Sequence, residues 1–266
     1  MPDDIRIHVL DRGRIETDVN HPVEAAVTAT ASEPNPDSLR GEGVVYNLVV
    51  AHPEATVLWD TGIHPEATSG HWPPALVERF TPRDPTAHRL PSALESAGFG
   101  LDDIDAVVQS HLHCDHAGGL AHFAGRETPV YVHRREVEHA YLSARTSAGD
   151  RVYVAEDFDR DLAWTVVHGD RRTIVPGVEL LHLPGHTPGL MGLLVRRDPP
   201  VLFTGDQAYV AANYEDGRAL GAGLLWSRPD WLASLDRLRD LERRLGATVV
   251  YGHDPEQFPS IQDGWG

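Results

Sequence analysis

Residues 111–119 combine several side chain types that bind transition metals. The segment reads His-Leu-His-Cys-Asp-His-Ala-Gly-Gly, so three imidazoles and one carboxylate fall within six positions. An apolar stretch at residues 106–109 precedes it, and small residues that favour a turn follow it. A divalent metal needs nitrogen and oxygen donors at this density, whereas a solvated polar loop does not. The segment therefore predicts metal chemistry at the end of a strand.

Three further candidate ligands also follow apolar stretches, and each has a glycine directly before it. They are His186, Asp206 and His253. Glycine lets the backbone turn sharply and come close to an ion. Each of these tripeptides alone is more typical of a turn than of a ligand. Their occurrence together with the first segment predicts one metal centre assembled from several strand ends.

Short strands are the elements that would carry these residues. Apolar and β-branched stretches bounded by Gly, Pro or Asp predict strands at residues 5–10, 44–51, 56–59, 106–109, 130–133, 163–167, 178–183, 190–195, 201–203 and 248–251. The stretch at residues 21–43 between the first two strands is too long for a simple turn and favours a binding element.

Three stretches predict helices. One covers residues 92–97, and a second covers residues 134–144 with Val137, Tyr141 and Leu142 on one apolar face. The third follows a capping box formed by Ser227 and Asp230. Gly246 is the expected cap at its end. Its apolar stripe consists of Leu232, Leu235, Leu238, Leu241 and Leu245.

The order of these elements predicts a fold class. Strands followed by helix, twice over, favour two sheets packed face to face with helices outside, a four-layer αββα sandwich. We find no linker between the two halves, so we expect one domain over residues 1–266.

Composition excludes several classes of protein. Hydrophobic residues make up 41% of the chain and charged residues 24%, which argues against wholesale disorder. The net charge is −17 and every basic residue except histidine is arginine, so nucleic acid is a poor partner. The acidic balance without lysine suits either a protein that works in concentrated salt or an arginine-biased genome.

The chain shows no targeting pattern. It starts Met-Pro-Asp-Asp, which lacks the features of a signal peptide, and no apolar run approaches the roughly 18 residues that span a membrane. Its one cysteine, Cys114, cannot form an internal disulfide. We therefore expect a cytoplasmic protein without a membrane partner, and a homodimer stays open.

The chain resembles the metallo-β-lactamase superfamily, whose signature His-x-His-x-Asp-His matches residues 111–116. The Asp-Thr-Gly element typical of that family appears at residues 60–62. The resemblance implies two metal ions, usually zinc, although a donor set without thiolate also admits iron, manganese or cobalt. It further implies one ion held by His111, His113 and His186, a second held by Asp115, His116 and His253, and Asp206 as the bridge between them.

Within that superfamily the chain is most similar to the N-acyl homoserine lactone lactonases. Tyr209 follows Asp206 by three residues, as in those quorum-quenching enzymes, and the long stretch at 21–43 and the insertion at 211–226 also fit. Position 114 departs from them, because it is often aromatic there and is a small cysteine here. We expect that cysteine to be buried rather than to bind metal.

This resemblance implies a hydrolase that opens a lactone ring by attack of a hydroxide shared between two ions. Tyr209 would donate to the developing oxyanion, and Asp115 would transfer the proton to the leaving oxygen. The alternatives are a thioesterase of glyoxalase II type and a lactonase for another small molecule such as pyridoxolactone. A phosphodiesterase, or a redox or metal-binding protein on the same scaffold, fits less well.

Several other residues attract weaker expectations. Asp60 is expected to orient a ligand, and His64 and His71 are candidates for the pocket rim. We expect His182 to be a core histidine, and the remaining histidines of this group to lie on the surface, namely His122, His133 and His139. Four aromatic residues could line a pocket or pack in the core: Trp72, Phe80, Tyr214 and Trp226.

Overall fold

Two sheets form the centre of the fold. The computed structural model describes residues 4–146 and 151–266, and it contains a seven-stranded and a five-stranded sheet. The seven-stranded sheet has the order β4-β1-β2-β3-β5-β6-β7. Its strands are β1 (Arg6–Asp18), β2 (Arg40–His52), β3 (Ala55–Trp59), β4 (Thr81–Arg83), β5 (Ala106–Val108), β6 (Val130–His133) and β7 (Trp164–Val167).

The five-stranded sheet has the order β12-β11-β10-β9-β8. Its strands are β8 (Arg171–Val175), β9 (Val178–His182), β10 (Met191–Val195), β11 (Val201–Phe203) and β12 (Thr248–Val250). The α-helices of the described residues are α1 (Pro74–Arg79), α2 (Leu90–Ser96), α3 (Cys114–Ala117), α4 (Arg134–Arg145), α5 (Ala155–Phe158), α6 (Ala211–Tyr214), α7 (Arg228–Leu245) and α8 (Phe258–Ile261).

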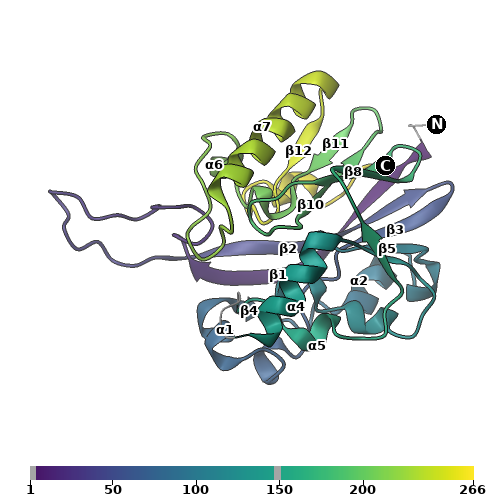
Figure 1. Cartoon of the computed structure of the whole chain (residues 1–266), viewed down its shortest axis with the longest axis horizontal. Coiled ribbons are helices and arrows are strands. Elements are labelled where there is room, and N and C mark those ends of the chain that lie inside the picture. The colour runs from purple at the N-terminus through teal and green to yellow at the C-terminus, as the bar shows by residue number, and fades with distance from the viewer. Residues whose placement is uncertain (1–3, 147–150) are drawn as a thin grey trace.

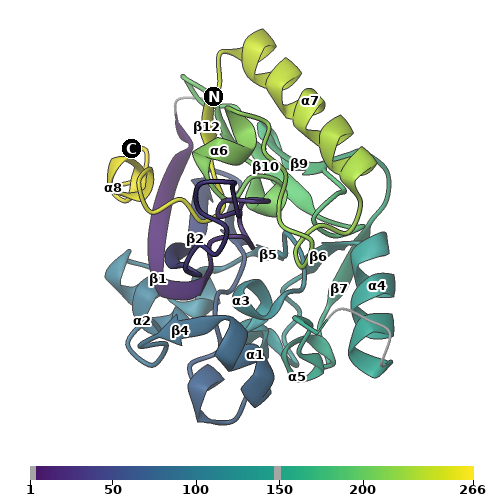
Figure 2. The same cartoon turned by 90° about the vertical axis from the view of Figure 1, so that its left-hand side faces the viewer.

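Alternation along the strands separates the layers. On β2, Leu48 and Val50 pack with Leu193 and Phe203 of the other sheet, whereas Val49 on the opposite face packs in the core that contains α2. On the five-stranded sheet, the outward side chains of β9 to β12 pack against the leucines of α7. Figure 1 and Figure 2 both show α7 on one side of the molecule and α1, α2 and α5 on the other. The four-layer αββα sandwich is therefore confirmed.

The third predicted helix agrees closely with the structure. Ser227 accepts a hydrogen bond from the amide of Asp230, and Gly246 ends the helix with φ of 62°. Its outer leucine, Leu232, is nevertheless 47% exposed. On α4, Leu142 is 61% exposed, so the predicted apolar face of that helix is wrong at this position.

Other predicted boundaries also differ from the structure. β1 continues well past residue 10, through a bulge between Asp11 and Arg14 where Gly13 has φ of 99°, and pairs with β2 and β4. The loop between β1 and β2 therefore spans residues 19–39 rather than 21–43, and it projects from the body of the molecule (Figure 1). Across the described ranges, we find no helix long and apolar enough to cross a membrane.

Candidate metal centre

Seven histidine and aspartate side chains from distant parts of the sequence converge where strands of both sheets end. The segment 111–116 follows β5 and runs into α3, which supplies Asp115 and His116. His186 lies in the loop between β9 and β10, and Asp206 and His253 follow β11 and β12. β11 and β12 are parallel neighbours, so their carboxyl ends deliver Asp206 and His253 to the same edge.

The first group comprises His111, His113 and His186. Nε2 of His186 lies 3.2 Å from Nε2 of His111 and 2.9 Å from Nδ1 of His113. All three rings are buried, and their donor atoms lie within 4.8 Å of one another. Three nitrogens that face one point at this spacing can share one cation.

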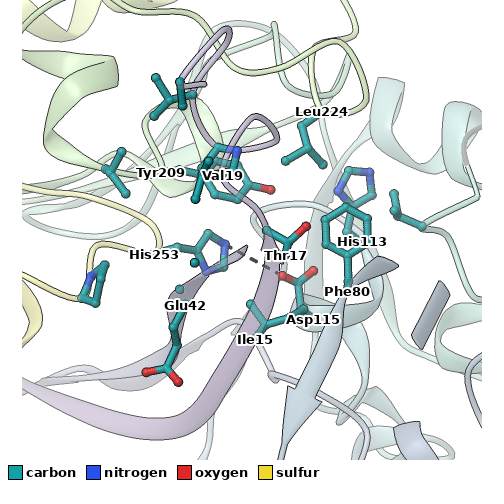
Figure 3. A pocket seen from close by; sticks show the side chains of 18 of the residues that line it. Ile15, Thr17, Val19, Glu42, Phe80, His113, Asp115, Tyr209, Leu224 and His253 are labelled. Atoms are coloured by element: carbon teal, nitrogen blue, oxygen red, sulfur yellow. Dashed lines mark ion pairs between the residues drawn. The ribbon is translucent and has the colours of Figure 1, made fainter. Parts of the chain in front are cut away.

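The second group comprises Asp115, His116 and His253. Oδ2 of Asp115 lies 3.7 Å from Nε2 of His116 and 3.9 Å from Nε2 of His253. Figure 3 marks the second of these contacts at the wall of a pocket. Asp115 is the more exposed member of the group, while both rings are buried.

Asp206 lies between the two groups, and each of its oxygens faces a different one. Oδ2 is 3.3 Å from Nε2 of His186 and 3.6 Å from Nε2 of His111. Oδ1 is 3.1 Å from Nε2 of His253 and 3.3 Å from Nε2 of His116. One carboxylate can therefore serve two cations at once.

The rings are oriented by contacts at their outer nitrogens. Nδ1 of His186 lies 2.6 Å from the carbonyl of Leu224, and Nδ1 of His253 lies 2.8 Å from the carbonyl of Val44. A carbonyl only accepts, so in both rings Nδ1 carries a proton, which leaves Nε2 as the atom that can bind a cation. Two similar contacts join Nδ1 of His116 to Asp60 at 2.9 Å and Nδ1 of His111 to Ser110 at 3.0 Å.

Charge and burial agree with a metal site. Burial lowers the pKa of His111 and His113 well below the ordinary value, so both rings are neutral and available as ligands. Burial alone would raise the pKa of Asp206, but His116, His253 and His111 outweigh it and hold that pKa well below its usual range. Asp206 is therefore a carboxylate.

Two buried atoms that point into the centre lack a hydrogen bond. Within the described ranges, Nε2 of His116 and Oδ2 of Asp206 make no hydrogen bond. Buried polar atoms are rarely left unsatisfied, and these two face the places where each group converges. A bound cation at each group would satisfy them, and a donor set of imidazole and carboxylate suits zinc, iron, manganese or cobalt. The residues therefore fit a pair of divalent ions.

An apolar pocket of about 280 Å³ opens beside the centre (Figure 3). Its walls include Ile15, Val23, Phe80, Val152 and Leu224, and four residues of the centre and its edge face it: His113, Asp115, Tyr209 and His253. The loop at residues 19–39 contributes to this wall, as does the insertion at 211–226. A ligand in the pocket would therefore combine apolar contacts with contact to the metal centre.

Tyr209 lies at the boundary between pocket and centre. Its ring centroid is 4.6 Å from that of His253 and 5.6 Å from that of His186. Burial raises its pKa well above the ordinary value, and the nearby carboxylates of Asp206 and Asp115 raise it further. The hydroxyl therefore keeps its proton at neutral pH and can donate.

Other residues singled out from the sequence have varied places. Cys114 is buried and lines the pocket, and Phe80 lies on the same wall. His64 and His71 stack on each other, and Nε2 of His71 lies 2.6 Å from Asp157, so neither lines the pocket.

The sequence suggested a surface position for His133, and this prediction is wrong. His133 is buried, because its ring stacks on His182. Of the remaining residues, Trp72, Tyr214 and His182 are buried, His122 and His139 are half-buried, and Trp226 is 48% exposed.

Asp60 contacts Nδ1 of His116, which agrees with its expected role of orienting a ligand. Sequence reasoning missed the other groups that support the histidines of the centre. Ser110 gave no signal beside the conspicuous histidines, and the carbonyls of Val44 and Leu224 leave no mark in a sequence. Glu136 was also missed, because a glutamate that follows two arginines on a helix is normally exposed, whereas this one is fully buried.

Comparison with known proteins agrees with this geometry. Residues 40–253 match the metallo-beta-lactamase superfamily. The chain is 33% identical to the N-acyl homoserine lactonase AiiB of Agrobacterium fabrum over 96% of each chain. It is also 33% identical to AiiA of Bacillus thuringiensis subsp. kurstaki over 79% of this chain and 80% of that one.

A similar solved structure is an N-acyl homoserine lactone hydrolase with N-hexanoyl-L-homoserine bound at its catalytic metal centre. It superposes with a TM-score of 0.81 at 27% identity and covers 96% of each chain. The chain therefore belongs to the metallo-beta-lactamase superfamily, as a relative of the N-acyl homoserine lactonases.

Proposed function

We propose that the protein is a dinuclear-metal lactonase that opens the ring of N-acyl homoserine lactones. The observation that carries the proposal is the placement of Asp206, whose two oxygens face two separate groups of ligand atoms beside an apolar pocket. The relatives named as N-acyl homoserine lactonases support the choice of substrate.

In this proposal the first group, His111, His113 and His186, holds one ion, and the second group, Asp115, His116 and His253, holds the other. Asp206 is shared between them. Two bound divalent ions supply Lewis acidity and make hydroxide available from water near neutral pH. We propose zinc for both positions, with iron, manganese and cobalt as the alternatives.

Tyr209 acts on the carbonyl oxygen of the lactone. It keeps its proton because burial and the neighbouring carboxylates raise its pKa, so it donates a hydrogen bond as negative charge develops on that oxygen. A donor already in place needs no reorganisation when the carbonyl carbon becomes tetrahedral.

Asp115 transfers a proton from the water to the leaving oxygen of the lactone. Its carboxylate lies on the pocket wall within reach of both rings of the second group. It accepts the proton of the attacking water and passes it to the ring oxygen when the carbon–oxygen bond of the lactone breaks. The product is the open hydroxy acid, and Asp115 ends the cycle as it began.

The apolar pocket holds the acyl chain. Aliphatic side chains from the loop at 19–39, from β1 and from the insertion at 211–226, together with the ring of Phe80, exclude water from the chain of the substrate. Cys114 contributes a small side chain to this wall, which leaves room for the acyl group near the metal centre.

We also propose that the protein works in the cytoplasm and that residues 1–266 form one domain.

A substrate panel tests the proposal. Purified protein is given N-hexanoyl homoserine lactone, a lactone without an amide, a glutathione thioester and a phosphodiester, and acid release is followed by pH-stat with and without chelator. We expect chelator-sensitive hydrolysis that is fastest on the acylated lactone. Faster turnover of the thioester would favour the glyoxalase II alternative, and preference for the plain lactone would favour a different lactone such as pyridoxolactone.

A further inference from the structure

His113 differs from the other histidines of the centre in its outer nitrogen. In His111, His116, His186 and His253 that nitrogen contacts a hydroxyl, a carboxylate or a carbonyl. Nε2 of His113 is buried and makes no hydrogen bond with any residue that the structure describes. A ligating histidine normally has its ring fixed by such a contact, so something else must fix this one.

The ring of Tyr153 packs against His113. The two ring centroids are 4.6 Å apart with an angle of 65° between the planes, an edge-on contact. Tyr153 is buried, and its hydroxyl donates a 2.8 Å hydrogen bond to Oε1 of Glu136. The ring that supports His113 is therefore itself held in place at its far end.

Glu136 also holds the two loops that carry the first group. Its Oε1 accepts the amide of Leu112 at 3.0 Å, between His111 and His113 in the chain. Its Oε2 accepts the hydroxyl of Thr187 at 2.6 Å, next to His186. The side chain is fully buried at the start of α4.

Gly189 brings the His186 loop against α4. A Cβ at position 189 would lie 2.2 Å from the amide nitrogen of Glu136, so only glycine permits this approach. The backbone contact and the three hydrogen bonds to Glu136 join α4, residue 112, residue 153 and residue 187 into one rigid unit around the first group.

We propose that Glu136 and Tyr153 are positioning residues for the first ion, replacing the hydrogen bond that His113 lacks at its outer nitrogen. The inference rests on the ligand set of the proposed function but not on the choice of substrate. It predicts that damage to this unit weakens metal binding at the first group and spares the second group, which Asp60 and the Val44 carbonyl support separately.

Two variants test the inference. Tyr153→Phe keeps the ring against His113 and removes only its anchor. Glu136→Gln replaces one of the two accepting oxygens by an amide N–H, so at least one of the groups that now donate to Glu136 must reverse or lose its hydrogen bond. Tyr141→Phe is the matched control, because its hydroxyl donates to the carbonyl of Phe158 and its ring packs away from the ligands. Each protein is loaded with zinc and dialysed against graded chelator, and the ions retained per chain are counted. The visible spectrum of the cobalt-loaded form reports ligand geometry.

We expect the wild type and Tyr141→Phe to keep two ions under conditions in which Tyr153→Phe keeps one. The affinity of the weaker site should fall about tenfold in Tyr153→Phe and up to about a hundredfold in Glu136→Gln, with an altered cobalt spectrum in both. If Glu136→Gln does not fold, Tyr153→Phe alone decides.

Metal retention and cobalt spectra equal to those of Tyr141→Phe would overturn the inference. If the two variants lose one ion selectively but the wild type does not hydrolyse lactones, the proposed function is wrong and the inference still holds. A wild-type chain that binds no metal would remove both.

Discussion

Oδ2 of Asp60 lies 2.9 Å from Nδ1 of His116, and this contact sets the tautomer of a residue in the second group. The amide and hydroxyl of Ser110 both donate to the same carboxylate, each at 2.7 Å. Because the carboxylate accepts from His116, the ring proton stays on Nδ1 and Nε2 faces Asp115 and Asp206. Asp60 has φ of 58°, a conformation that aspartate and asparagine tolerate better than most residues.

Asp60→Asn should therefore fold but lose metal at the second group. The amide N–H of asparagine would face Nδ1 of His116 and favour the tautomer with its proton on Nε2, which cannot bind a cation. We expect the affinity for one of the two ions to fall about tenfold to a hundredfold, measured by chelator competition. Asp105→Asn is the control, since Asp105 also accepts a backbone amide, that of Thr56, but lies outside the centre. Equal loss in both variants would contradict the role given to Asp60.

Asp115→Asn should separate proton transfer from metal binding. Asparagine keeps an oxygen that can face His116 and His253 but cannot accept and return a proton. We expect kcat on the acylated lactone to fall about 10²-fold to 10⁴-fold while much of the metal stays bound, as counted by elemental analysis. Turnover near that of the wild type would exclude Asp115 from the proton path.

Tyr209→Phe should reduce kcat about 10²-fold or more with a smaller effect on KM, because the hydrogen bond to the oxyanion strengthens only as charge develops. Since its pKa lies well above the ordinary value, Tyr209 itself should cause no loss of activity as pH rises to about 10. Tyr251→Phe is the matched control, because the Tyr251 hydroxyl donates to Glu215 and the residue does not line the pocket. An unchanged kcat in Tyr209→Phe would make this ring a packing element only.

The convergence of the seven side chains and the fold could be predicted because their signals are local. The His-x-His-x-Asp-His spacing, the glycine before each later ligand and the alternation of strands and helices all appear within short windows. The structure brings the donor atoms of these residues within a few ångströms, although they come from four separate segments.

Apart from the role of Asp60, the supporting contacts could not be predicted, because they depend on tertiary neighbours. Main-chain carbonyls of Val44 and Leu224 orient two histidines, and any residue type could supply them.

Other features missed from the sequence are a strand and two buried polar residues. β8 begins with Arg171 and Arg172 at the edge of its sheet, so it shows little of the apolar signal of a strand. Glu136 and His133 lie in a charged stretch that is typical of a surface, and only the packing of α4 buries them.

The stacked pair His133 and His182 predicts how stability depends on pH. The rings are 3.8 Å apart and nearly parallel. Burial first of all, and then the charges of His182, Arg135 and His168, lower the pKa of His133 to about 4 against the opposing backbone contact with Gly169. The unfolded chain, with a histidine pKa near 6.5, therefore binds more protons than the folded chain between pH 6.5 and 4. Stability contributed by neutral His133 is present above that window and is lost as pH falls through it.

His133→Asn isolates this contribution. His133 caps α4 by accepting the amide of Arg135 at Nδ1, and asparagine is also a good helix cap, so the variant keeps the cap and removes the proton uptake. In urea unfolding with chelator present, we expect the wild type to lose about 1 kcal/mol more stability than the variant between pH 7 and pH 5, after allowance for solvent screening. His52→Asn is the matched control, because His52 accepts the amide of Glu54 in the same way outside the stacked pair. Parallel pH profiles for the wild type and His133→Asn would show that His133 titrates alike in the folded and unfolded chain.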